Sequence, residues 1–163
     1  MKLVATNLKE QMEIASNEGW DALERGEWAG AELAYDTAIK AARELKDALA
    51  EALFRSYRGE ARRGQGRADE ARTDIDHSLA IAQAENCLQI VAHSQFLLSE
   101  LDTDAGDDSK AIDRLLKALD AALECSDITT VEVSFGKLGL MYLDMGWREA
   151  ASECFRQALE QSG

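Results

Sequence analysis

Residues 134–160 read SFGKLGLMYLDMGWREAASECFRQALE, and this stretch holds two helical patterns separated by Gly146. In the second pattern, apolar residues recur at the spacing i, i+4, i+7 and i+8, which places them on one face of a helix. These residues are Ala151, Phe155, Ala158 and Leu159. The charged residues between them lie largely off that face. The stretch therefore predicts two helices joined by a tight turn. The second helix has one apolar face and one polar face that is exposed to solvent.

The same pattern recurs at a fixed interval of 40 residues along the chain. Glycine occupies positions 26, 66, 106 and 146, and alanine occupies positions 31, 71, 111 and 151. A fixed period of this length is typical of stacked repeat proteins, in which each unit buries its apolar face on its neighbours. We therefore predict a single all-α domain over residues 1–163. Its four helix-turn-helix repeats lie at approximately 7–46, 48–86, 88–126 and 129–161.

Each repeat contains two predicted helices, so the chain has eight. The absence of proline and the abundance of alanine, leucine, glutamate and arginine favour helix throughout. The predicted helices are 7–25, 28–46, 48–64, 68–85, 88–104, 108–125, 129–145 and 148–161.

Small residues recur in the middle of the first helix of each repeat. Gly19, Gly59 and Gly139 occupy this position, and Ser99 keeps the small size in the third repeat. Glycine inside a helix costs about 1 kcal/mol relative to alanine. We therefore expect another helix to pack closely at this point. The glycines at 26, 66, 106 and 146 instead end the first helices, where a positive φ costs glycine least.

Polar residues at the predicted helix starts are typical of N-caps. Asp47, Asp107 and Asp127 are expected to cap the helices that follow them. Asn7 with Glu10, and Asn86 with Gln89, have the spacing of capping boxes.

The formal net charge of −13 repels nucleic acid and anionic membranes. A solvated acidic surface explains this charge, and attraction to a basic partner is the alternative. No apolar run reaches the length of a signal peptide or a transmembrane helix. The three cysteines include no CxxC pair, which argues against a disulfide framework or a zinc site. We expect a cytoplasmic protein whose partner is another protein or a peptide, with no nucleic acid and no membrane.

Motifs for catalysis are missing from the sequence, which contains no P-loop, no HExxH and no GxSxG. Residues 64–66 form a lone GxG at the end of a predicted helix, with no strand before it. His77 and His93 have no partner at metal-ligand spacing. We therefore expect no enzymatic activity, no cofactor and no bound metal.

The repeat resembles the tetratricopeptide repeat (TPR) family. The family pattern is an aromatic residue, Leu-Gly, Tyr, Gly, Ala, an aromatic residue and Ala-Leu. In the fourth repeat these places are occupied by Phe135, Leu138, Gly139, Tyr142, Gly146, Ala151, Phe155, Ala158 and Leu159. The first repeat matches through Gly19, Gly26, Trp28, Ala31, Tyr35, Ala38 and Ile39. The second and third repeats match less well.

The resemblance implies a right-handed α-solenoid whose first helices line a concave groove for an extended peptide or a partner helix. The common unit has about 34 residues and often ends in proline. This unit has 40 residues and no proline. In that respect it is similar to Pins/LGN-type adaptors, kinesin light chains and bacterial peptide-sensing regulators.

The register of the resemblance places sixteen residues on the groove. They are Glu13, Ser16, Trp20, Leu23, Leu53, Ser56, Glu60, Arg63, His93, Phe96, Glu100, Thr103, Val133, Gly136, Leu140 and Leu143. Trp20 and Phe96 are the expected hot spots for binding. The alternative is that helix packing partly covers these residues. Chaperone-binding members of the family have polar or basic residues where this chain has Trp20, Glu60 and Glu100. The resemblance therefore argues against a reader of C-terminal carboxylates and favours a basic or amide-rich ligand.

Arg55, Arg58 and Arg62 form a stripe on one face of the helix predicted at 48–64. Three unpaired arginines cannot be buried cheaply. They either extend beside acids on the same surface or face the carboxylate of a ligand. The candidate acids are Glu51, Asp69 and Asp74.

We therefore predict a protein–protein interaction module, an adaptor or chaperone-like protein that binds a peptide or a partner helix in its groove. One alternative is a self-assembling scaffold whose groove is filled by a second copy. Another is a peptide-sensing regulatory protein that acts through a partner. The chain is expected to be a monomer or a homodimer. The apolar side chains of Val133, Leu140 and Leu143 are the reason that a homodimer is retained as an alternative.

Overall fold

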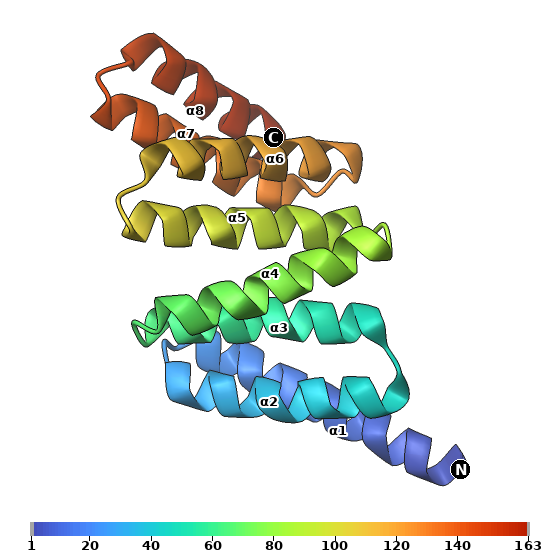
Figure 1. Ribbon diagram of the computed structural model, residues 1–163. Coiled ribbons are helices and arrows are strands. Elements are labelled where there is room, and N and C mark those ends of the chain that lie inside the picture. The colour runs from blue at the N-terminus through green and yellow to red at the C-terminus, as the bar shows by residue number, and fades with distance from the viewer. Residues whose placement is uncertain (1, 163) are drawn as a thin grey trace. The chain divides into compact units, whose positions relative to one another are not determined.

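The computed structural model of this protein describes residues 2–162, with side chains for residues 6–161. Within these residues the chain forms eight helices that pack in consecutive pairs (Figure 1). The helices are α1 (Lys2–Glu24), α2 (Trp28–Leu45), α3 (Ala48–Gly64), α4 (Ala68–Ala84), α5 (Leu88–Asp104), α6 (Asp108–Glu124), α7 (Ile128–Asp144) and α8 (Arg148–Ser162).

The predicted helices are confirmed, and seven of them agree with the structure to within one residue at each end. The exception is α1, which begins at Lys2 and runs through Asn7. The capping box predicted at Asn7 is therefore wrong. The residues before Asn7 include neither proline nor glycine, so nothing in the sequence stops the helix from continuing toward the N-terminus.

The residues that end the helices recur at the same 40-residue interval as the helices. Gly26, Gly66, Gly106 and Gly146 end the first helices with φ between 69° and 78°, as predicted. Lys46, Asn86 and Ser126 end the second helices at φ between 55° and 58°, which the sequence did not predict because none of them is glycine. Since Asn86 lies in this left-handed conformation, it does not begin α5, and the capping box predicted there is wrong.

The predicted aspartate caps are confirmed. Asp47 accepts a hydrogen bond from the amide of Ala50 at 2.9 Å. Asp107 accepts one from Lys110 at 3.1 Å, and Asp127 accepts one from Thr130 at 3.2 Å. Each cap satisfies an amide at the start of a helix that has no partner within that helix.

The chain divides into two compact units, Met1–Asn86 and Cys87–Gly163. In the first unit α2 packs between α1 and α3, and α3 packs on α4. In the second unit the order α5, α6, α7, α8 repeats this pattern, and α5 also touches α7. The single domain over residues 1–163 remains a prediction.

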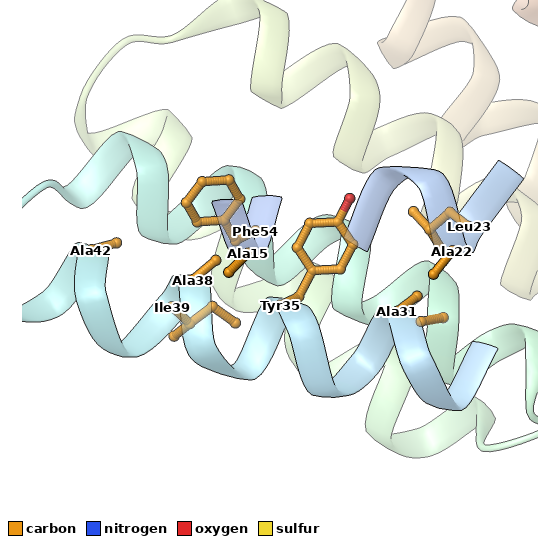
Figure 2. Packing of buried hydrophobic residues seen from close by; sticks show 10 residues of the cluster. Ala15, Ala22, Leu23, Ala31, Tyr35, Ala38, Ile39, Ala42 and Phe54 are labelled. Carbon is orange, nitrogen blue, oxygen red and sulfur yellow. The ribbon is translucent and has the colours of Figure 1, made fainter. Parts of the chain in front are cut away.

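The core of the first unit is built around the Tyr35 ring of α2 (Figure 2). The ring stacks on Phe54 of α3 with the centroids 6.1 Å apart. On the α1 side it lies directly against Gly19, where an added Cβ would be 2.8 Å from the ring atom Cζ. Glycine at this position therefore lets the two helices approach closely.

The same contact recurs in the other helix pairs that contain a mid-helix glycine. A Cβ on Gly59 would lie 2.6 Å from Cγ1 of Ile75, and one on Gly139 would lie 2.5 Å from Cε1 of Phe155. Ser99 takes this position in α5 and is fully buried. The close packing predicted from the small residues is thus confirmed at the three glycines.

Two glycines of α7 allow this contact to be tested by the same substitution. Gly136 has no atom within 4 Å of an added Cβ, so Gly136→Ala should raise the free energy of unfolding by about 0.5–1 kcal/mol through helix propensity. Gly139→Ala gains the same propensity but drives a methyl group into the Phe155 ring. We expect its unfolding free energy to lie about 1–3 kcal/mol below that of Gly136→Ala. Urea unfolding followed by circular dichroism measures both, and equal stabilities would contradict the packing argument.

Candidate interaction surfaces

The arginine stripe of α3 is neutralised by acids of the two neighbouring helices. Asp74 of α4 is almost fully buried and accepts hydrogen bonds from Arg58 at 2.6 and 2.8 Å. Arg62 lies 2.9 Å from the same carboxylate, and Arg55 lies 3.3 Å from it. Each oxygen of this buried carboxylate therefore has at least one charged donor, which offsets part of the cost of removing it from water.

Acids of α2 and α3 complete this network. Arg58 donates to Asp36 at 2.5 Å, and Arg62 donates to Glu32 at 2.9 Å. The hydrogen bond to Asp74 is the main reason that the pKa of Arg58 is raised, while burial opposes the rise and Asp36 adds to it. Burial alone would raise the pKa of Glu32, but hydrogen bonds from Gln65, Arg62 and other donors lower it.

The arginine stripe is therefore an internal ion-pair network, as in the first of the two sequence interpretations. Arg55 also donates to Glu51 at 2.9 Å, so Glu51 and Asp74 were identified correctly as partners. Asp69 is not a partner of these arginines among the described residues, whereas Glu32 and Asp36 had not been expected. Because its charges are already compensated, the stripe offers no site for the carboxylate of a ligand.

Trp20 is an exposed member of the predicted groove residues of the first unit. This ring is exposed, and its edge contacts Tyr57 of α3 with the centroids 5.6 Å apart. One turn earlier, Glu13 and Ser16 line a shallow cleft of about 250 Å³ between α1 and α3. An exposed tryptophan held by a second aromatic ring is a typical anchor for a protein partner.

Two predicted groove residues of the first unit lie inside it. Leu23 belongs to the buried cluster around Tyr35. Ser56 is fully buried, and its hydroxyl donates to the carbonyl of Leu53 at 2.7 Å. These two side chains support helix packing, so the groove register is wrong for them. Leu53, Glu60 and Arg63 are half-buried.

The exposed members of the predicted groove residues of the second unit lie on α7. Val133, Leu140 and Leu143 are exposed, and their spacing of i, i+7 and i+10 places them along one side of the helix. We call these three residues the α7 face. A row of exposed leucine and valine side chains is uncommon on a folded protein unless something binds it.

An ion pair borders the α7 face. Lys137 of α7 lies 2.7 Å from Glu100 of α5, and both side chains are largely covered. Glu100 is therefore already compensated, which removes the basis for expecting it to attract a basic ligand. Phe96 is half-buried and packs on the core of the second unit, so it is a weaker candidate for an anchor than the sequence suggested. Thr103 and Gly136 are also half-buried.

His93 of α5 is half-buried. Its Nε2 atom has no access to solvent. Burial lowers the pKa of His93 from its usual 6.5 to about 4, and the negative charge of Asp127 only partly opposes this shift. The ring is therefore neutral at physiological pH.

The sequence reasoning missed two residues that form these surfaces. Tyr57 supports Trp20, and Lys137 pairs with Glu100. Each comes one residue after a position that the family resemblance assigns to the groove, Ser56 and Gly136. Helical spacing could have indicated Lys137, because it lies four residues after Val133 and three before Leu140.

Within residues 2–162 no cluster of three or more His, Cys, Asp or Glu side chains could hold a metal ion. Among the same residues, no helix combines the length and the apolar character that crossing a bilayer requires.

Comparisons with known proteins identify the fold. No protein-family model matches the chain, and no curated protein sequence matches it. The crystal structure of BtubC (BKLC) from P. vanneervenii is similar, with a TM-score of 0.73 and 18% identity over 94% of this chain and 73% of that one. A crystal structure of MamA has a TM-score of 0.65 and 19% identity over 99% of this chain and 84% of that one. A second MamA structure has a TM-score of 0.54 and 19% identity over 94% and 92% of the two chains.

BtubC and MamA are TPR proteins. The resemblance to the TPR is therefore confirmed for the fold, an all-α solenoid whose helices pack in consecutive pairs. At this level of identity the likeness carries no information about which residues bind a partner.

The ion-pair network predicts a large effect for one carboxylate. Asp74→Ala leaves Arg55, Arg58 and Arg62 without their shared partner, so the free energy of unfolding should fall by about 3 kcal/mol. Asp113→Ala is the matched control, because Asp113 forms an exposed pair with Lys117 on α6. That variant should change stability by less than about 0.5 kcal/mol. Urea unfolding compares the two, and an equally small effect of Asp74→Ala would contradict the network.

The pKa of His93 predicts a pH dependence. The folded pKa of about 4 lies below the ordinary value of 6.5, so the unfolded chain takes up the proton first. Stability from this group is therefore complete above pH 6.5 and is lost as the pH falls toward 4. We expect wild type to lose about 3 kcal/mol more than His93→Gln over this range. Urea unfolding at several pH values tests this, and parallel curves would contradict it.

Proposed function

We propose that this protein works by binding another protein, and that the α7 face binds an apolar segment of that partner. The single observation that carries this proposal is the exposed row of Val133, Leu140 and Leu143. These side chains lie on a first helix of the repeat, the helix that lines the groove in TPR proteins. Burying them on a partner would remove apolar surface from water at about 25 cal/mol per Å².

The α7 face favours a partner helix or an extended peptide with apolar anchors. The adjacent Lys137 and Glu100 neutralise each other, so the face itself has no excess charge. Specificity on such a surface comes from the fit of a few apolar side chains, with charged residues at the rim. The net charge of −13 adds long-range attraction to partners that are basic overall.

Trp20 supports a second contact of the same kind in the first unit. Its exposed ring is fixed against Tyr57, so little conformational entropy is lost when a partner covers it. We therefore assign the adaptor role to binding on the first helices of the repeats.

Capture of partners from native lysate tests the proposal with paired variants. Leu140→Asp places a charge on the α7 face and should reduce capture of a partner at least about tenfold, or about 1.4 kcal/mol. Leu116→Asp is the control, because Leu116 is exposed to a similar degree in the same unit but lies on α6. Trp20→Ala tests the first unit separately.

Circular dichroism should show that each variant is folded, since the substituted side chains are exposed. A partner that wild type and both leucine variants retain equally would place binding elsewhere and refute the α7 face. A partner lost by Leu140→Asp and retained by Leu116→Asp is the expected result.

A further inference from the structure

Three aromatic rings of the first unit form a row that leads from its core to its surface. The Tyr35 ring is fully buried and stacks on Tyr57 of α3 with the centroids 5.4 Å apart. Tyr57 in turn contacts Trp20 of α1, and the planes of these two rings meet at 71°. Trp20 is 47% exposed, although the ring behind it is fixed by the core. The row therefore ends in an indole that is held in place and presented to solvent.

An exposed indole of this kind attracts positively charged side chains. The face of an aromatic ring carries partial negative charge, and tryptophan binds an ammonium or guanidinium group better than tyrosine or phenylalanine does. Because Tyr57 holds the Trp20 ring, a ligand that stacks on it orders little of the protein.

The carboxylate of Glu60 lies close to this aromatic row. Burial is the main reason that the pKa of Tyr57 is raised, and the negative charge of Glu60 raises it further. Burial likewise raises the pKa of Tyr35, with Tyr57 and then Glu60 as the further causes. Arg63 follows Glu60 by one turn of α3, so the charge of α3 is mixed at this point.

The helix that carries Trp20 is strongly acidic. Residues 6–24 of α1 hold five acids and one lysine. None of these acids forms an ion pair among the described residues, in contrast to the compensated charges of α3 and α4. The surface of α1 around Trp20 therefore favours a cation over an anion or a neutral group.

Glu13 places one of these acids at a second position on the same side of α1. It lies seven residues before Trp20, and it lines the cleft of about 250 Å³ together with Ser16, Asn17 and Phe54. Seven residues of an α-helix span about 10.5 Å. Three residues of an extended peptide span about 10 Å. Two basic residues three apart in an extended segment therefore match Trp20 and Glu13.

We propose that the first unit binds an extended basic segment of a partner protein, in which two lysine or arginine residues stand three apart. One cationic side chain stacks on the Trp20 indole, and the other pairs with Glu13 in the cleft between α1 and α3. This inference rests on the proposed contact of a partner with Trp20 and names the chemistry of that contact. The α7 face is apolar and takes no part in it.

Nuclear magnetic resonance with a defined peptide tests the proposal directly. The probe is the hexapeptide GRGGRG, blocked at both ends, and its control is the same peptide with citrulline in place of each arginine. Citrulline keeps the shape of arginine but has no charge. The indole N–H signal of Trp20, assigned by its loss in Trp20→Phe, should shift and saturate with the arginine peptide. The citrulline peptide should bind at least about fivefold more weakly.

A pair of variants separates a local contact from the general attraction of an acidic protein. Glu13→Gln should weaken the binding of GRGGRG by about threefold, because it removes one ion pair. Glu44→Gln is the control, because Glu44 is exposed on α2 and forms no ion pair among the described residues. It changes the net charge by the same amount and should leave the affinity unchanged. Circular dichroism checks that both variants are folded.

The spacing is tested by the isomeric peptide GRRGGG, in which the arginines are adjacent. It should bind about threefold more weakly than GRGGRG, because its second arginine does not reach Glu13. Equal affinity of the two peptides would refute the spacing of three residues.

Other outcomes overturn the proposal as a whole. It is wrong if the Trp20 signal does not shift up to about 10 mM GRGGRG, or if the citrulline peptide binds equally well. Equal losses in Glu13→Gln and Glu44→Gln would reduce the effect to net charge. The peptide should bind Leu140→Asp like wild type, whereas capture of a partner by Leu140→Asp reports on the α7 face. Failure of the basic-segment proposal and failure of the proposed function are therefore distinguishable.

Discussion

The structure depends on a contact that recurs in three of the four repeats, between a large side chain of the second helix and a glycine of the helix before it. Tyr35 on Gly19 and Phe155 on Gly139 leave no room for even a methyl group. Interiors packed at this density tolerate little change in volume. The contact therefore sets how closely the two helices approach.

The second repeat keeps the close contact between its two helices but has charged residues beside it. Ile75 packs on Gly59 in the usual way, but Arg58 stands where the fourth repeat has Leu138. Two oppositely placed acids, Asp74 and Asp36, make this substitution possible. A charged layer of this kind contributes less to stability than an apolar one of equal volume, but it strongly penalises any arrangement that separates its members.

Most of the fold could be predicted from the sequence, because a repeated pattern supplies each inference four times. The start of α1 was missed because capping residues indicate where a helix can begin and cannot show that it does. The binding residues were harder to predict, since the register of a related fold says which side of a helix faces a groove and nothing about side-chain length. Leu23 and Ser56 are buried, and Glu100 forms an ion pair with Lys137. These outcomes depend on how neighbouring helices pack, which the sequence pattern does not specify.

The arginines of α3 also restrict the order in which the repeats can follow one another. Arg58 pairs with Asp36 on the preceding second helix, and only the first and second repeats have an acid at this place, as Asp36 and Asp76. If the second repeat were moved to follow the third, Arg58 would meet Leu116 in place of that carboxylate. Rearrangements that place the second repeat after the third or the fourth would thus encode chains in which Arg58 lacks this carboxylate. Recombination among the four units is restricted, although their backbones are nearly interchangeable.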